Sequence, residues 1–282
     1  MDYGRLALTR ALRQLPTHIV LAPLVFLWVY PFLWMLSSGF KTQSEMMLGG
    51  LNLWPQTWTL DNFGRAWEGA NFAGYSLNTL IISTTVVAIV VVVSSLAGYA
   101  LSQDTLPGKR VIVGVLVATM FMPKGFSILP VFVLINALGL NNSLPGIILA
   151  EAGPAHVIAV LLFMGFFKSI PADITEAAII DGASKLRIYW QIMLPLATPV
   201  VATVAIFNFI ATWNAFLVPL VFTLANPALR TLGVGMYAFF GEYSTDWTGL
   251  AAGSVMAVLP IIVVFLLLQR YFIQGLAGAV RG

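Results

Sequence analysis

Long apolar runs alternate with short polar intervals along most of this chain. A run of about 20 apolar residues is long enough for an α-helix to cross a bilayer, and a helix pairs its own backbone polar groups there. The pattern therefore predicts an all-α membrane protein with six transmembrane helices. The predicted spans are His18–Ser38, Leu77–Leu101, a run from near Leu106 to Pro123, Gly146–Phe167, Pro199–Phe222 and Leu250–Tyr271.

The third run meets Pro123-Lys124-Gly125, which is expected to end or bend a helix. Ser127–Leu138 then predicts a short helix at the outer surface, closed by Gly139. A single long, kinked span that reaches Asn136 is the alternative.

The interval from Lys41 to Tyr75 is polar and rich in tryptophan, a residue that suits the membrane–water boundary. It is too short to form a domain of its own. We therefore expect one transmembrane domain over residues 1–282, with the first helix and an outer loop in 1–76 and a five-helix core in about 77–271.

A second polar interval, residues 169–195, has the pattern of two short helices joined at a glycine, and we call it the elbow. Ala172–Ile180 is rich in good helix formers. Gly182 should end this helix, because glycine tolerates the left-handed conformation of a helix end. A second helix is predicted from Ser184 until Pro195 stops it. The apolar stripe predicted for the first helix is Ile174, Ala177, Ala178 and Ile180.

Basic residues are unevenly distributed between the two sets of connections. If the N-terminus is cytoplasmic, ten of the 14 lysines and arginines fall on the cytoplasmic side, in agreement with the positive-inside rule. Both termini and the elbow are then predicted to be cytoplasmic. The cytoplasmic set is Arg5, Arg10, Arg13, Lys109, Arg110, Lys168, Lys185, Arg187, Arg270 and Arg281, and the outer set is Lys41, Arg65, Lys124 and Arg230.

Composition supports a membrane protein and excludes several functions. Only 9% of residues are charged, against about 25% in soluble domains. The chain has no cysteine, which excludes a thiolate zinc site, and His18 and His156 lack companion ligands at metal spacing. The absence of a P-loop sequence excludes that kind of ATP site, and the absence of a long basic run goes against a nucleic-acid partner.

Within the elbow, Glu-Ala-Ala at residues 176–178 is followed by Gly182 and by Ile-x-Leu-Pro at residues 192–195. This spacing resembles the EAA loop of permease subunits in ATP-binding-cassette (ABC) importers. The embedded Ile-Asp-Gly-Ala at residues 180–183 is similar to the carbohydrate-uptake subfamily, typified by the smaller permease of the maltose system. The candidate ATPase-coupling residues are Glu176, Ala177, Ala178, Asp181, Gly182, Ala183, Ile192, Leu194 and Pro195.

The resemblance extends to the C-terminal part of the chain, including Trp213-Asn214 and Thr245-Asp246-Trp247. The ending, Gly275–Gly282, is similar to the glycine-rich tail of the family, although it is one residue shorter and has Ala277 and Arg281 in place of threonine and lysine. Gly275 and Arg281 are therefore candidate contacts with the ATPase. A frayed terminus is the alternative.

The resemblance implies the type I ABC importer permease fold in a prokaryotic plasma membrane, and transport of a sugar or a related polyol or oligosaccharide. It also implies three kinds of protein partner: a second permease subunit, a cytoplasmic ATPase dimer that binds ATP and Mg²⁺, and an extracytoplasmic solute-binding protein. The chain itself is expected to bind no cofactor and to catalyse no reaction.

Three alternatives are a permease for a non-sugar solute such as a glycerol phosphate, a secondary carrier and a membrane-embedded enzyme. A secondary carrier of the repeat type has two similar halves, and no internal repeat is evident. An enzyme needs a convergent set of acid–base or metal-binding groups, and none is visible in the sequence.

Polar residues inside the fifth predicted span are candidates for the transport pathway or its outer gate. They are Asn208, Thr212, Trp213 and Asn214. Polar groups in hydrocarbon are costly unless they face a partner or a wet cavity. Ordinary hydrogen bonds between helices are the alternative explanation.

Lys124 and Glu151 are also gate candidates, because both are predicted near the outer end of a span and at similar depth. We expect them to form an ion pair beside the outer mouth of the pathway. In the alternative, each side chain reaches separately to the lipid headgroups.

Overall fold

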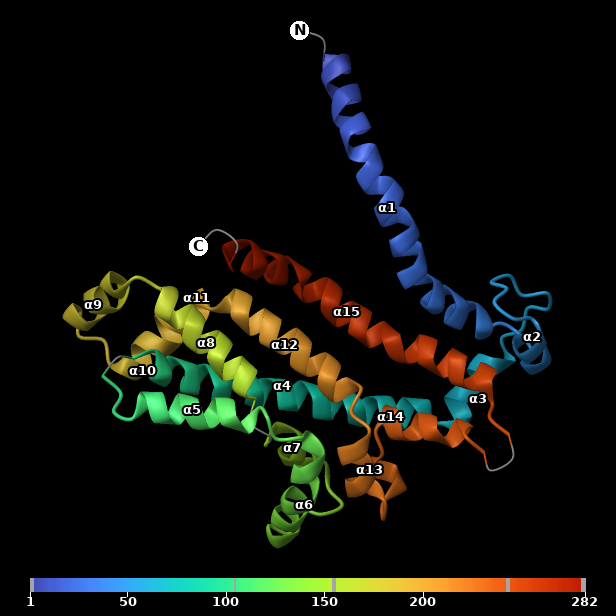
Figure 1. Ribbon diagram of the computed structural model, residues 1–282. Helices are drawn as coiled ribbons and strands as arrows, with labels where there is room; N and C mark the ends of the chain where they lie inside the picture. The colour runs from blue at the N-terminus through green and yellow to red at the C-terminus, as the bar shows by residue number, and fades with distance from the viewer. Residues whose placement is uncertain (1–2, 104, 154–155, 242–243, 280–282) are drawn as a thin grey trace. The chain divides into compact units, whose positions relative to one another are not determined.

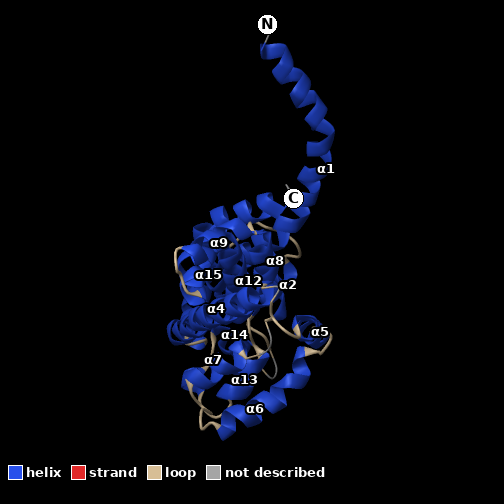
Figure 2. Cartoon of the chain, turned by 90° about the vertical axis from the view of Figure 1, so that its left-hand side faces the viewer, coloured by secondary structure: helices blue, strands red, loops and turns tan. Residues whose placement is uncertain are grey.

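The computed structural model describes residues 3–103, 105–153, 156–241 and 244–279. In these ranges the regular secondary structure is helical, and the only strand-like feature is an isolated bridge between Phe240 and Thr245. Figures 1 and 2 show helices joined by loops, of which the one between Leu48 and Asp61 is long. The predicted all-α class is confirmed.

Three helices are long and apolar enough to cross a membrane, and each matches a predicted span. They are α1 (Tyr3–Ser38), α4 (Phe72–Ser102) and α15 (Trp247–Ala279), with candidate membrane segments at Thr17–Ser38, Phe72–Ser102 and Trp247–Tyr271. The first, second and sixth predicted spans are therefore confirmed as continuous helices.

The third predicted span is not a long helix. Its helix, α5 (Lys109–Thr119), has 11 residues, fewer than the roughly 17–25 that a spanning helix needs. It begins after Gly108, which has a φ of 71°, and it ends before Pro123, as the sequence predicts. The short turn η1 (Lys124–Ser127) and the separate helix α6 (Ile128–Ala137) follow, so the predicted short helix after Pro123 is confirmed.

The fourth and fifth predicted spans are each divided into two helices, and the expectation of continuous helices there is wrong. The fourth consists of α7 (Leu144–Ala152) and α8 (Val157–Ser169), with axes 58° apart. The fifth consists of α12 (Thr198–Trp213) and α13 (Leu217–Thr223). In a continuous fifth helix Pro219 would leave the carbonyl of Ala215 without its usual partner, and a new helix beginning at Leu217 avoids this.

By length and composition, the described part of the chain has three helices able to span a membrane, or up to five if two bent pairs are each counted as one span. These pairs are α7 with α8, and the segment Lys185–Leu196 with α12. The other helical segments are α2 (Gln43–Leu48), α3 (Asp61–Gly69), α9 (Ala172–Ile180), α10 (Lys185–Ile188), η2 (Tyr189–Met193), α11 (Leu194–Leu196), η3 (Pro227–Leu229), α14 (Leu232–Gly235) and η4 (Met236–Phe239).

Residue contacts divide the chain into two compact units. The first comprises Met1–Ala70 and Ala238–Met256, and the second comprises Asn71–Tyr237 and Ala257–Gly282. The expectation of a single transmembrane domain over residues 1–282 stays a prediction, so each unit is described separately.

The second unit is built around α4, which packs against α7, α8 and α12 (Figure 1). One face of α4 carries buried residues four positions apart, Ile82, Val86 and Val90. This spacing places them on one side of the helix, as packing against several neighbours requires.

Near its C-terminal end α4 comes very close to α8, and Gly98 makes this possible. A Cβ atom added at Gly98 would lie 2.5 Å from the Cβ of Phe163 and 2.9 Å from the backbone nitrogen of Met164. Small residues at helix contacts allow backbones to approach in this way. Any larger side chain at position 98 would push the two helices apart.

We predict that Gly98→Ala lowers the stability of the detergent-solubilised protein by about 1–3 kcal/mol, the usual cost of overpacking. Thermal unfolding followed by circular dichroism measures the change. Gly165→Ala on α8 is the matched control, because a Cβ at Gly165 meets no atom within 4 Å. Equal melting temperatures for the two variants would contradict this account of the α4–α8 contact.

Candidate functional site

The first helix of the elbow, α9, spans Ala172–Ile180 as predicted and ends in a Schellman motif. The amide of Ala183 donates to the carbonyl of Ala178 at 2.9 Å, and the amide of Gly182 donates to that of Ile179 at 2.9 Å. Gly182 has a φ of 77°, in the left-handed region that glycine adopts without steric cost. The predicted role of Gly182 as the end of this helix is confirmed.

The second helix of the elbow begins where the sequence predicts. The Ser184 hydroxyl accepts a hydrogen bond from the amide of Arg187 at 3.3 Å, which caps α10. Four residues, Asp181 to Ser184, lie between the two helices. Asp181 is the C-cap of the first helix and Ser184 is the N-cap of the second. Two capped ends on either side of so short a turn hold the elbow in one conformation.

This helix ends at Leu196, one residue after Pro195, where the sequence predicts its stop. Before Pro195 the chain passes through a π-helical turn, Tyr189–Met193, which the sequence did not predict. Proline lacks an amide hydrogen and crowds the carbonyl four residues earlier, here that of Gln191. The wider π turn just before Pro195 accommodates both effects. The chain then bends by 75° before α12.

The elbow exposes an apolar surface on both of its helices. Ile180 is 86% exposed, and Ile179, Leu186 and Trp190 are also exposed. Of the predicted apolar stripe on α9, Ala178 is buried, whereas Ile174, Ala177 and Ile180 are exposed. Most of the apolar side chains of α9 therefore lie on the surface of the described part of the chain.

Glu176 and Asp181 add negative charge to this exposed surface. Within the described residues, the Glu176 carboxylate has no ion pair or side-chain hydrogen bond. Ile192 and Leu194 are half-buried, and they pack on the core of the second unit. The structure thus places the predicted coupling residues in one continuous segment, with the acidic groups outside and the Ile-x-Leu-Pro part partly inside.

Comparison with known proteins identifies the family of the chain. The profile of the family described as "binding-protein-dependent transport system inner membrane component" matches residues 106–278, which include the whole elbow. The chain belongs to this family.

Among its relatives, the diacetylchitobiose uptake system permease protein NgcG of Streptomyces coelicolor is 36% identical, over 88% of this chain and 83% of that protein. The fold is similar to that of a chain of a bacterial ABC transporter involved in the import of the polysaccharide alginate, with a TM-score of 0.79 and 24% identity over 94% of this chain and 98% of that one. A second alginate transporter structure, solved with an alginate-bound periplasmic protein, gives a TM-score of 0.62 and 13% identity over 92% and 94% of the two chains. The resemblance to sugar ABC importer permeases is confirmed, and these relatives are permease subunits rather than enzymes.

The predicted pathway residues of the permease lie on or next to α12. The side-chain amides of Asn208 and Asn214 donate to carbonyls of their own helix, those of Val204 and Ile210, both at 2.8 Å. These two side chains therefore do not join helices to one another. Their role in a pathway or gate stays a prediction.

Trp213 and Thr212 differ from the two asparagines. The Trp213 indole nitrogen donates to the carbonyl of Ala257 at 3.0 Å and so joins α12 to α15. Trp213 and Thr212 are both buried. For Trp213 the alternative of an ordinary contact between helices describes the observed bond.

Two further pairs of candidates, Lys124 with Glu151 and Gly275 with Arg281, lie partly outside the described part of the structure. The side chain of Lys124 is not described, so its predicted ion pair with the half-buried Glu151 stays a prediction. In the tail, Gly275 is in α15, whereas Arg281 lies outside the described residues. A tail contact with an ATPase also stays a prediction.

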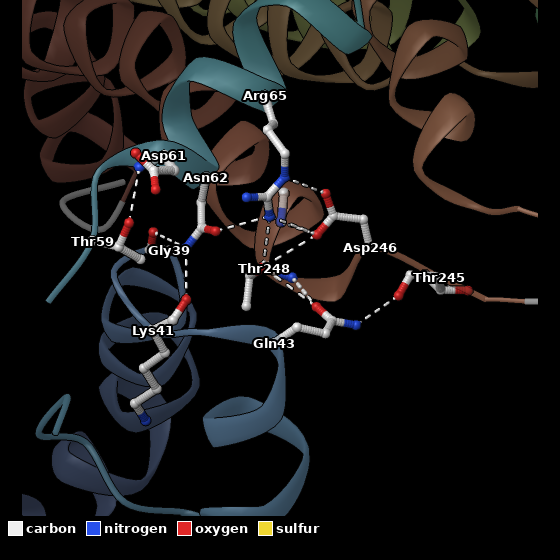
Figure 3. Close-up of polar contacts among 11 residues, drawn as sticks. Gly39, Lys41, Gln43, Thr59, Asp61, Asn62, Arg65, Thr245, Asp246 and Thr248 are labelled. Atoms are coloured by element: carbon white, nitrogen blue, oxygen red, sulfur yellow. Dashed lines mark hydrogen bonds and ion pairs between the residues drawn. The ribbon is translucent and has the colours of Figure 1, made fainter. Parts of the chain in front are cut away.

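Sequence reasoning missed a polar cluster in the first unit, which Figure 3 shows. Arg65 of α3 makes a bidentate contact with Asp246, since its Nε and Nη2 lie 3.1 Å and 3.1 Å from the two carboxylate oxygens. The Arg65 Nη2 also donates to Asn62 at 2.9 Å and to the Thr248 hydroxyl at 3.1 Å. Asp246 in turn caps α15 by accepting from the amide of Gly249 at 2.8 Å.

Two amide side chains connect this cluster to the segment after α1. Gln43 donates to the carbonyl of Thr245 at 2.8 Å and accepts from the amide of Thr248 at 3.2 Å. The buried Asn62 donates to the carbonyls of Gly39 and Lys41 at 2.8 Å and 2.7 Å. The cluster therefore ties three separate segments of the first unit together: the segment after α1, α3 and the start of α15 (Figure 3). It lies beside an open groove of about 650 Å³ lined by Arg65, Glu68, Gly69, Ala238, Phe239, Gly241, Ser244 and Asp246.

The sequence carried one signal for this cluster, an aspartate just before the apolar run of the last span. Burial alone would raise the pKa of Asp246. The hydrogen bond from Arg65, the amide of Gly249 and the charge of Arg65 outweigh burial, and they hold the pKa below its ordinary value. Hydrogen bonding to Asp246 likewise raises the pKa of Arg65.

We predict that Asp246→Asn destabilises the first unit at pH 7, and that its difference from the wild type shrinks only below about pH 4. A lowered carboxylate pKa adds stability above the unfolded value near 4, and this stability is lost as the pH falls through the folded value. The expected loss at pH 7 is about 1 kcal/mol at most, because partly exposed ion pairs contribute little. Unfolding of the detergent-solubilised permease between pH 3 and 7 measures it.

Glu68→Gln is the matched control, since Glu68 lines the same groove and makes no ion pair in the described residues. A difference between Asp246→Asn and the wild type that grows as the pH falls from 7 to 5 would contradict the prediction.

Proposed function

We propose that this permease is one of two transmembrane subunits of an ATP-driven importer, and that it couples to a separate ATPase through the elbow. The observation that carries the proposal is the Schellman-capped α9, a short helix that exposes Glu176, Ile179 and Ile180. A rigid helix pair transmits a displacement better than a flexible loop, and an apolar surface rimmed by acidic groups suits a partner groove with basic residues. ATP and Mg²⁺ then belong to the ATPase, and this chain needs no cofactor.

The proposed solute is a sugar or a related polyol or oligosaccharide. Diacetylchitobiose and alginate, named for NgcG and for the fold relatives, support this class. The structure with an alginate-bound periplasmic protein supports delivery by an extracytoplasmic binding protein. A non-sugar solute such as a glycerol phosphate is the second candidate, whereas the family goes against a secondary carrier.

The proposal includes a membrane arrangement. Six spans with both termini in the cytoplasm follow from the apolar runs and the distribution of basic residues, if three segments of the second unit each cross the membrane. These segments are α5 with its flanking residues, α7 with α8, and α12 with α13. This arrangement puts the elbow on the cytoplasmic side of a prokaryotic plasma membrane, where an ATPase reaches it.

We predict that Gly182→Val and Glu176→Lys lower the amount of ATPase that co-purifies with the tagged permease, without reducing membrane insertion. A non-glycine residue at a φ of 77° costs about 1–2 kcal/mol, which corresponds to several-fold weaker association. Charge reversal at Glu176 places a cation where a carboxylate is proposed to meet a basic group. ATP-dependent uptake should fall in parallel.

The matched controls keep one property of each residue. Gly182→Asn retains a residue that tolerates the left-handed region, and Glu176→Gln retains size without charge. Normal assembly and uptake by Gly182→Val and Glu176→Lys would remove the elbow as the coupling element.

A further inference from the structure

One buried hydrogen bond joins the elbow to α4. The Tyr189 hydroxyl and the Ser95 Oγ lie 2.6 Å apart, and Ser95 and Tyr189 are 0% and 1% exposed. The Ser95 hydroxyl donates to the carbonyl of Val92 at 3.1 Å, so the Tyr189 hydroxyl is the donor to Ser95. A bond of this kind has a direction and a fixed length, and burial protects it from competition by water.

The aromatic ring of Tyr189 extends this connection to α8. Its centroid lies 5.5 Å from that of Tyr99 on α4, and Tyr99 lies 5.7 Å from Phe167 on α8. Phe167 stacks on Phe163 at 5.9 Å, beside the close α4–α8 contact at Gly98. The hydroxyl and ring of Tyr189 thus touch a packed path through two core helices.

Tyr189 is also the first residue of the π turn. The amide of Leu194 donates to the carbonyl of Tyr189, five residues earlier. A π turn in an α-helix holds one extra residue in the turn and is less favourable than the regular α pattern. The anchored Tyr189 side chain fixes where this extra residue sits, and so fixes the direction in which the elbow leaves the core.

The other buried residues of the elbow make only apolar contacts with this core. Ile188 and Met193 are buried beside Tyr189, and Ala178 is the buried residue of α9. Apolar contacts are non-directional, so they permit sliding. Among these buried residues, Tyr189 alone makes a side-chain hydrogen bond to α4.

We propose that the Tyr189–Ser95 bond is the joint through which a displacement of the elbow reaches α4. Tyr189 acts as a positioning residue through Ser95, and the π turn keeps the joint in register. This inference rests on the proposed function, because it needs an ATPase that moves the elbow. Without the bond, the elbow still docks, but α4 follows its movement less completely.

The test uses the whole transporter in liposomes, with spin labels on this chain. The chain has no cysteine, so Leu80→Cys on α4 and Ala211→Cys on α12 introduce the only two labelling sites on it, both at exposed positions. In complexes whose other subunits lack cysteine, pulsed electron paramagnetic resonance measures the distance between labels before and after trapping with MgATP and vanadate. The wild type is expected to show a second distance after trapping.

In Tyr189→Phe and in Ser95→Ala, we expect the ratio of molecules at the second distance to molecules at the first distance to fall by about two- to tenfold. This is the effect of losing one hydrogen bond. The double variant should match the single ones, because all three remove the same bond. Ser95→Thr keeps a hydroxyl and should restore the shift. Ser94→Ala, one residue away and also buried, is the matched control and should behave as the wild type.

Two outcomes would overturn this inference and leave the proposed function standing. In the first, the variants melt at a lower temperature but show the same distances after trapping as the wild type. In the second, the two labels in the wild type show a single distance before and after trapping. Co-purification of the ATPase is measured on the same samples. If the wild type retains no ATPase, or if Gly182→Val retains as much as the wild type, the proposed function fails instead.

Discussion

Every backbone N–H and C=O group in an apolar environment needs a hydrogen-bond partner within the protein, because water is not there to supply one. This requirement constrains the whole permease, since most of its segments are apolar. Helices meet this constraint locally, and the described residues are accordingly helical. Where proline removes an amide hydrogen, the chain widens at Tyr189–Met193 or starts a new helix at Leu217. The irregular parts of the second unit are therefore responses to the same constraint as its helices.

The elbow combines a stiff outer part with a directional inner anchor. Its turn is fixed by backbone bonds around Gly182 and by the Ser184 cap, so little of its shape depends on the rest of the chain. Its inner end depends on the core, through Tyr189 and the apolar residues beside it. In the proposed function, the outer part would bind the ATPase and the inner anchor would transmit its movement to α4.

The first unit combines apolar packing with a polar cluster. Aromatic contacts join Phe40 to Phe63 and Trp58. Hydrogen bonds and one ion pair of Arg65, Asp246, Gln43 and Asn62 join the segment after α1, α3 and the start of α15, with the cap on α15 as their common point. The cluster contains the Thr-Asp-Trp segment whose resemblance to sugar permeases was visible in the sequence, and it gives Asp246 a structural reason.

The sequence by itself determined the helical class, three of the long helices, both ends of α9 and the family, because apolar periodicity, glycine and capping residues act within a few neighbouring positions. It did not determine the breaks in the fourth and fifth predicted spans or the π turn before Pro195, where packing against neighbours competes with local rules. Nor did it reveal the Arg65–Asp246 and Ser95–Tyr189 contacts, whose partners are 181 and 94 residues apart. Such pairs form only where the tertiary structure brings two helices or loops together, and no local pattern encodes which side chains then meet.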